Sequence, residues 1–187
     1  MSSGRIIKVV TLTIAGGLLV IAGVVYGIGT LLPVAHIAAV RGELPATRER
    51  VWQAITDWSQ QAQWRSDVAA VEIVSVQGDD VVWVEVDAWG DSLRLVTVSL
   101  DPSHKMVTKI ADAAGNAKAP FAGTWTFELD DDGPGTYIQI VEEGEVYDPL
   151  LRFVAAVFIG HGATIERYIS DLRQHLETPG NDTTGQG

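Results

Sequence analysis

The sequence predicts an α+β protein: a curved antiparallel sheet wrapped around a long C-terminal helix, preceded by a separate membrane-spanning helix. Three observations carry this prediction. Residues 9–32 contain no charge, and the chain between residues 68 and 142 alternates apolar and polar side chains. Residues 148–176 then place apolar side chains at steps of three and four, the period of one helix face. A helix that long needs a broad cover, and the strands are the only cover available.

The N-terminal segment predicts a membrane anchor. Residues 1–8 are short and basic, and residues 9–32 read VVTLTIAGGLLVIAGVVYGIGTLL. About 20 apolar residues cross a bilayer core of about 30 Å, whereas the apolar part of a cleaved signal peptide has only about 7–15. We therefore expect a single-pass helix that contacts the lipid bilayer through residues 9–32, rather than a signal peptide.

Two further expectations concern this helix. Arg5 and Lys8 are the basic residues closest to its start, which favours a cytoplasmic N-terminus and a globular domain outside the cytoplasm. Gly23 and Gly27 have the spacing at which two membrane helices approach closely, so they could support a weak homodimer. Glycine is common in membrane helices, and the pair alone does not decide between dimer and monomer.

The globular domain is expected over residues 33–177, and it starts with a strand over residues 33–45. Thr47 is a typical helix N-cap, and apolar residues at helical spacing follow it to about Trp58. A second short helical piece ends near Arg65. Residues 178–187, TPGNDTTGQG, are polar and are expected to form a disordered tail.

The period then changes from helical to alternating, which predicts six strands joined by short turns. Short turns rich in Gly, Asp and Pro join antiparallel neighbours. The expected strands are residues 68–76, 81–89, 93–100, 106–111, 124–129 and 137–142, and the long helix spans residues 148–176.

Composition excludes several functional classes. The formal net charge is −11 and the sequence pI is about 4.6, which argues against nucleic acid as a partner. The chain has no cysteine, its histidines lack metal-ligand spacing, and it carries no nucleophile-elbow, P-loop, dinucleotide or zinc-peptidase motif. We therefore expect no metal and no cofactor.

Three stretches give the domain a resemblance to a known superfamily: TRERVWQAITD at residues 47–57 followed by Trp64, PFAGTWTFEL at residues 120–129, and EEGEVYDP at residues 142–149 leading into LRF. The pattern resembles the SRPBCC superfamily, which includes START lipid-transfer domains, pollen-allergen proteins and polyketide cyclase/dehydrase proteins. The resemblance implies a helix-grip fold with a cavity between sheet and C-terminal helix. It also implies an apolar or amphipathic ligand, a hydrophobic small molecule or a lipid.

Seven residues are candidates for the cavity lining. Most are aromatic side chains, which suit a pocket that holds a ring or an acyl chain. Core packing explains each tryptophan equally well. The candidates are Trp64, Arg65, Trp83, Trp89, Trp125, Phe158 and His161.

Three of these candidates have a competing interpretation. Alternation places Trp83, Glu85, Asp87 and Trp89 on one face of a strand, and we expect this face to be in solvent because a buried carboxylate without a partner is costly. Arg65 could meet a ligand carboxylate or phosphate, but the default expectation is a solvated surface side chain.

His161, between Gly160 and Gly162, is the one weak candidate for a catalytic residue. It could move a proton, since histidine titrates near neutrality, or it could be a packed histidine bonded to a backbone carbonyl. The leading functional hypothesis is a membrane-anchored domain that binds or transfers a hydrophobic small molecule or lipid. The alternatives are an enzyme like a polyketide cyclase or dehydrase, and a protein-interaction module displayed on the membrane.

Overall fold

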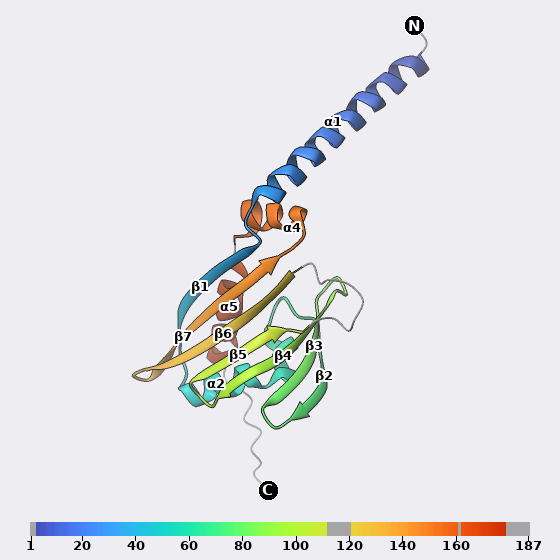
Figure 1. Ribbon diagram of the computed structural model, residues 1–187. Helices are drawn as coiled ribbons and strands as arrows, with labels where there is room; N and C mark the ends of the chain where they lie inside the picture. The colour runs from blue at the N-terminus through green and yellow to red at the C-terminus, as the bar shows by residue number, and fades with distance from the viewer. Residues whose placement is uncertain (1–2, 112–120, 161, 179–187) are drawn as a thin grey trace.

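The computed structural model describes residues 3–111, 121–160 and 162–178. A helix at the N-terminus stands apart from an α+β domain in which a curved sheet wraps around a helix (Figure 1). The helices are α1 Ser3–Leu31, α2 Arg48–Thr56, η1 Trp58–Gln60, α3 Gln61–Trp64, α4 Pro149–Val154, η2 Ala155–Ile159 and α5 Ala163–Glu177. The strands are β1 Ala35–Leu44, β2 Ala70–Gln77, β3 Asp80–Val86, β4 Ser92–Asp101, β5 Lys105–Ile110, β6 Phe121–Asp132 and β7 Gly135–Val146.

All the described strands form one antiparallel sheet in the order β1-β7-β6-β5-β4-β3-β2. Strands β2 to β7 follow one another in space as they do in sequence, which is the arrangement that short turns impose. Only β1 is out of sequence: it pairs with β7, from Ala35 opposite Glu145 to Leu44 opposite Thr136. The predicted order of strand, two small helices, six strands and helix is confirmed.

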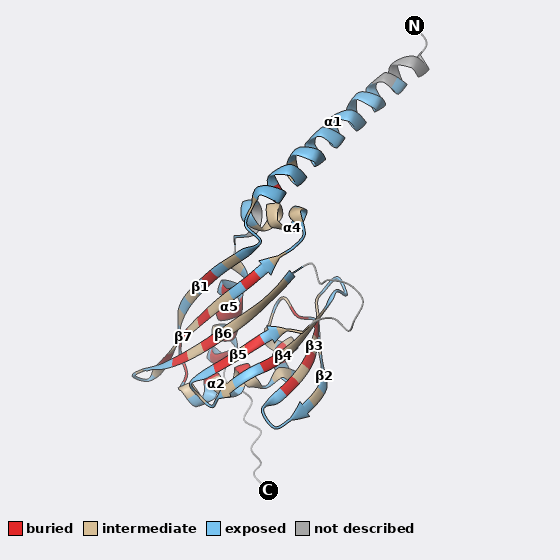
Figure 2. Cartoon of the chain, viewed as in Figure 1, coloured by how far each residue is buried: buried red, intermediate tan, exposed pale blue. Residues whose placement is uncertain are grey.

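The core lies between the concave face of the sheet and α5 (Figure 2). The apolar face of α5 is at most 4% exposed at each of its buried residues, which are Ile165, Tyr168, Ile169, Leu172 and Leu176. Gly42 on β1 allows the helix to come close, since a Cβ there would lie 2.6 Å from Cγ2 of Ile169. Strands β6 and β7 supply the facing side chains Phe127, Leu129, Ile138 and Ile140.

The small helices close one end of the core. Thr47 caps α2 as predicted, and its hydroxyl accepts a hydrogen bond from the Arg50 backbone N–H at 3.5 Å. Val51 and Ile55 on α2 are fully buried. Gln61 at the start of α3 is also buried, and its side-chain amide donates to the Ile55 carbonyl at 3.0 Å, which ties the two helices together.

The predicted continuous helix over residues 148–176 is wrong in its first half. The chain instead forms α4, the π-helical turn η2, and a break at Gly160, whose φ of 73° ends the helix before α5 begins. Positive φ is readily adopted only by glycine, and it ends the helix at this residue. The apolar residues keep their helical spacing on both sides of Gly160, which is why the sequence pattern predicted one continuous helix. The helix that buries its apolar face against the sheet is α5, and it is the long C-terminal helix of the fold.

The N-terminal helix α1 projects from the domain, and its segment Val10–Leu31 is long and apolar enough to cross a membrane. Its last turn is packed against α4. A Cβ on Gly29 would collide with the Pro149 carbonyl oxygen, and Nη1 of Arg152 donates to the Leu32 carbonyl at 2.7 Å. The domain and the helix are therefore joined by close contacts.

Gly23 and Gly27 have open space beside them. A Cβ placed on either glycine would have no described atom from outside the helix within 4 Å. The homodimer through these glycines stays a prediction. The disordered tail also stays a prediction, since residues 179–187 lie outside the described part of the chain.

Candidate ligand-binding cavity

A cavity of about 530 Å³ lies between the concave face of the sheet, the small helices and the start of α5. Its wall is mainly apolar, built by inward-facing side chains of β3 to β6. The apolar lining comprises Trp58, Val68, Trp83, Val86, Ala88, Trp89, Leu93, Leu95, Met106, Ile110, Phe121, Trp125 and Phe127. The helix face contributes Thr164, Arg167 and Tyr168.

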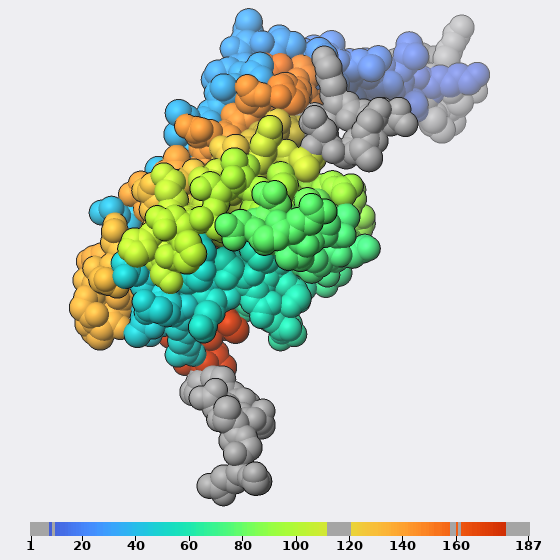
Figure 3. All heavy atoms as spheres, turned by 60° about the horizontal axis from the view of Figure 1, so that its bottom comes forward, coloured from blue at the N-terminus to red at the C-terminus, as the bar shows by residue number. Residues whose placement is uncertain are grey.

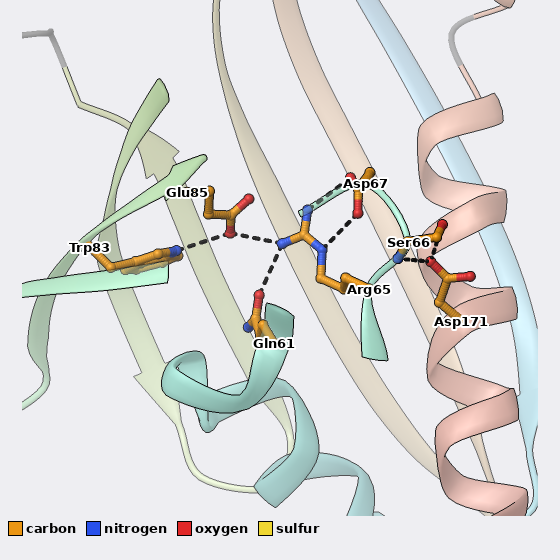
Figure 4. A network of polar contacts seen from close by, with 7 residues as sticks. All are labelled: Gln61, Arg65, Ser66, Asp67, Trp83, Glu85 and Asp171. Atoms are coloured by element: carbon orange, nitrogen blue, oxygen red, sulfur yellow. Dashed lines mark hydrogen bonds and ion pairs between the residues drawn. The ribbon is translucent and has the colours of Figure 1, made fainter. Parts of the chain in front are cut away.

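A cluster of buried polar side chains forms one part of this wall, centred on Arg65 (Figure 4). The Arg65 side chain is 9% exposed and pairs with both Asp67 and Glu85. Nε and Nη2 donate to the two Asp67 oxygens at 3.1 and 3.0 Å, and Nη1 donates to Oε1 of Gln61 at 2.9 Å and of Glu85 at 2.7 Å. Four of the five guanidinium N–H groups are thus engaged.

The electrostatics of the cluster hold Arg65 charged and Tyr168 neutral. Burial lowers the pKa of Arg65, but the carboxylates of Glu85 and Asp67 outweigh it and leave that pKa above its ordinary value. Burial raises the pKa of Tyr168, whose ring lies 5.3 Å from the guanidinium carbon of Arg65. The nearby charge of Arg65 lowers the pKa of Tyr168, but by less than burial raises it. A buried cation, two carboxylates and a neutral phenol therefore share one end of the cavity.

The predicted solvent face of β3 is wrong. Trp83 is 3% exposed and Glu85 is 9% exposed, so both face the cavity rather than solvent. Burial of the Glu85 carboxylate does not leave it without a partner. Its Oε1 accepts one hydrogen bond from Arg65 and another from Nε1 of Trp83, the latter at 3.0 Å. The second oxygen of Glu85 points away from both donors (Figure 4). Glu85 therefore keeps acceptor capacity beside the cavity.

The default expectation of a solvated Arg65 is wrong as well. The anion-binding alternative has little support, because Asp67 and Glu85 already neutralise the guanidinium. The described lining carries five acidic residues, Asp67, Glu85, Asp87, Asp91 and Glu142, against two basic ones, Arg65 and Arg167. The balance of five negative against two positive charges disfavours an anionic ligand and suits a neutral or cationic one.

The structure brings four of the predicted residues to the cavity: Arg65, Trp83, Trp89 and Trp125. Trp89 lies in the turn after β3 and is 88% exposed, so it belongs to the rim rather than the interior. Trp64 does not line the cavity. Its ring stacks on His175 at 5.8 Å and meets Tyr168 edge-on at 5.2 Å, behind the cavity wall.

The remaining two predicted residues gain no support. Phe158 belongs to η2, which precedes the break, and its side chain is not described. His161 lies outside the described residues. No group of three or more His, Asp or Glu side chains in the described chain could hold a metal ion.

Sequence reasoning missed Asp67, Glu85 and Tyr168. One signal could have found the pairing of Arg65 with Glu85. Arg65 is the only basic residue between Arg50 and Arg94. If Glu85 faces inward, Arg65 is therefore the one basic residue in this stretch that could neutralise its charge. No comparable signal marks Tyr168, which reads as one more apolar position on the face of α5.

A helix-grip fold with a roomy, largely apolar cavity defines a ligand-binding domain of the START-like class. Residues 36–177 match the family described as polyketide cyclase / dehydrase and lipid transport, and the chain belongs to that family. The resemblance inferred from the sequence is confirmed. A search of the curated proteins gave no match.

Solved structures show the same fold at low sequence identity. A START superfamily protein from Mycobacterium smegmatis is 19% identical with a TM-score of 0.57, covering 76% of this chain and 97% of that one. The Zhui aromatase/cyclase from Streptomyces sp. R1128 is 14% identical with a TM-score of 0.62, covering 81% and 99%. A norcoclaurine synthase from Thalictrum flavum is 11% identical with a TM-score of 0.60, covering 78% and 96%. These similarities establish the fold, and two of the three names, the aromatase/cyclase and the norcoclaurine synthase, are names of enzymes.

Proposed function

We propose that this protein is a membrane-anchored domain that takes a hydrophobic small molecule or lipid into the cavity between its sheet and α5. The observation that carries the proposal is the cavity itself, about 530 Å³ with a mainly apolar wall and one polar end. Pockets for small organic ligands measure roughly 300–1,000 Å³ and have this character. A core that only needed to be filled would not keep such a volume.

The polar end suggests the chemistry of the ligand. The Glu85 carboxylate is held in place by Arg65 and Trp83, and its second oxygen is free to accept a hydrogen bond. A ligand hydroxyl or ammonium group would satisfy this oxygen, whereas a ligand carboxylate would meet it with like charge. We therefore infer an amphiphile with an apolar body and a neutral hydrogen-bond donor or cationic end.

The anchor is the second part of the proposal. Segment Val10–Leu31 has the length of a membrane span, and Gly29 and Arg152 join its last turn to the folded domain. Such a contact is of use only in a helix that stays attached, so it favours an anchor over a cleaved signal peptide. The basic residues Arg5 and Lys8 favour a cytoplasmic N-terminus, with the domain on the other side. A tether keeps the cavity at high effective concentration near a ligand dissolved in the bilayer.

A second candidate function is catalysis of the cyclase or dehydrase kind. It is favoured by the ionisable groups at the polar end of the cavity, where Glu85 could accept a proton and Tyr168, held neutral, could donate a hydrogen bond. Glu85→Gln separates the two functions. In an enzyme this change would abolish turnover of the bound molecule, whereas a carrier would show no turnover before or after the change and would only bind its ligand more weakly.

Native mass spectrometry of the full chain, released from its membrane, tests ligand binding. The cavity-filling variant Leu95→Trp is compared with Val98→Trp, which alters the same strand at an exposed position. We expect a co-purifying hydrophobic molecule on the unmodified chain and on Val98→Trp, and its loss from Leu95→Trp. Equal recovery from both variants would place the bound molecule outside the cavity and refute the proposal.

A further inference from the structure

The segment between β7 and α5 has a composition unlike the rest of the domain surface. Residues 149–160 read PLLRFVAAVFIG, in which Arg152 is the only charge. We call Pro149–Ile159, which comprises α4 and η2, the junction segment. Three of its large apolar side chains are exposed: Leu150 by 51%, Leu151 by 40% and Val157 by 56%. A water-soluble surface would not usually gather apolar residues in this way.

The position of the junction segment is fixed by α1. The Pro149 backbone packs on Gly29, and Arg152 donates to the carbonyl of Leu32, so both contacts fall on the last turn of α1 and its end. The two elements lie against each other at one end of the molecule (Figure 3). At about 1.5 Å per residue, a span of this length runs about 33 Å, against a hydrocarbon core of about 30 Å. In an α1 that spans the bilayer, the last turn therefore lies at the boundary of the hydrocarbon core.

We propose that the junction segment lies in the headgroup layer of the bilayer and forms a second membrane contact beside α1. The proposal rests on the membrane-spanning role of α1 that is part of the proposed function. Contact with α1 brings the exposed Leu150, Leu151 and Val157 to the depth at which an interfacial helix buries its apolar face. The single cation, Arg152, does not oppose this placement, because arginine side chains at the membrane interface keep their charge in the polar headgroup layer, and one of its N–H groups also donates to the Leu32 carbonyl at the end of α1.

Other residues at the same end of the sheet agree with this placement. Val146, the last residue of β7, pairs with Phe121 at the start of β6, and β1 begins in the same region, opposite Glu145. Ile37, Tyr147 and Phe121 are exposed there by 72%, 44% and 36%. Phe121 is also part of the cavity lining. The membrane contact therefore turns the Phe121 rim of the cavity toward the bilayer, from which a hydrophobic ligand would enter.

Site-directed fluorescence on the full chain tests the contact. The chain has no cysteine, so a single introduced cysteine takes an environment-sensitive label cleanly. Leu150→Cys and Val157→Cys report on the junction segment, Leu19→Cys reports on α1, and Val76→Cys, 62% exposed on β2, is the control in water. Each labelled chain is placed in phosphatidylcholine nanodiscs with lipid-attached quenchers at the headgroup or at mid-chain.

We expect the headgroup quencher to remove most of the emission at Leu150→Cys and Val157→Cys and little at Val76→Cys, independently of salt because the contact is apolar. Leu19→Cys should respond to the mid-chain quencher. If Leu19→Cys is quenched while both junction labels behave like Val76→Cys, the contact does not exist although the anchor does. If Leu19→Cys is not quenched, the anchor itself fails. Disulfide-linked dimers of the unlabelled Leu150→Cys chain, together with no quenching of the labelled chain, would assign the surface to a second copy and also overturn the proposal.

Discussion

Replacing Arg65 by methionine should destabilise the domain strongly, because it leaves two carboxylates without their cation. The Arg65 side chain is 9% exposed and that of Glu85 is 11% exposed, whereas that of Asp67, at 25%, keeps more water. Two unit charges about 4 Å apart attract by about 4 kcal/mol at an effective dielectric constant of about 20. Removing one partner of a buried pair typically costs about 3–5 kcal/mol. We expect a loss of about 3–5 kcal/mol in the free energy of unfolding, mostly through Glu85.

The chain offers a matched control for this change. Lys105 and Glu128 form an ion pair with a separation of 2.8 Å, close to the 2.7 Å between Arg65 and Glu85, but their side chains are 47% and 43% exposed. Lys105→Met removes the same unit charge from a solvated pair, which should cost at most about 1 kcal/mol. The difference between the two variants isolates the effect of burial.

Denaturant unfolding of the full chain in detergent micelles measures both losses. All the tryptophans lie between residues 52 and 125, so their fluorescence reports on the domain and not on α1. Adding Glu85→Leu to Arg65→Met should recover a substantial part of the loss, since the stranded carboxylate is then gone. A loss from Arg65→Met as small as that from Lys105→Met would show that the cluster is solvated and refute the reasoning.

Three further predictions concern other parts of the chain. Gly29→Leu should separate α1 from α4 and raise amide hydrogen exchange in α4, whereas Gly27→Leu, with open space around it, should not; equal exchange in both would contradict the packing. Burial, followed by the charge of Arg50, lowers the pKa of His175, so the folded domain binds this proton less readily than the unfolded chain. Its stability should therefore decline as the pH falls below about 6.5, and His175→Gln should remove that part of the decline in pH-dependent unfolding; an unchanged profile would exclude His175 as its source. Trp89→Ala should leave stability within about 0.5 kcal/mol, since the side chain is 88% exposed, but should slow ligand uptake measured by stopped-flow fluorescence; unchanged uptake would remove Trp89 from the entry route.

The order and type of the elements could be predicted because they depend on local patterns. Alternation between residues 68 and 142 marks strands, Thr47 marks a helix start, and the steps from Ile165 to Leu176 mark the face that α5 buries. The helical period continued through residues 148–160 although α4, in that part of the chain, packs mainly against α1. Periodicity shows that a segment has an apolar face, but it does not show what covers that face.

The polar end of the cavity could not be predicted, for a related reason. Alternation shows that Trp83 and Glu85 share a face of β3, but it does not say whether that face is inside. The inward orientation depends on Arg65, which reaches Glu85 from a different element 20 residues away. A buried charge is stable only with its partner, and partners that meet through the tertiary fold leave little trace in local sequence.

A comparison of ligands that differ only in their polar end tests the central claim most directly, namely that the cavity binds an amphiphile with a neutral hydrogen-bond donor or a cationic end. A long-chain alcohol, amine and carboxylic acid of equal length are titrated into the delipidated full chain, with Leu95→Trp as the blocked cavity. Because the acidic lining exceeds the basic lining and Glu85 keeps a free acceptor, the alcohol and the amine should bind at least about tenfold more tightly than the acid. Leu95→Trp should weaken all three. An acid that binds as tightly as the amine, or binding that Leu95→Trp leaves unchanged, would contradict the proposed cavity and its chemistry.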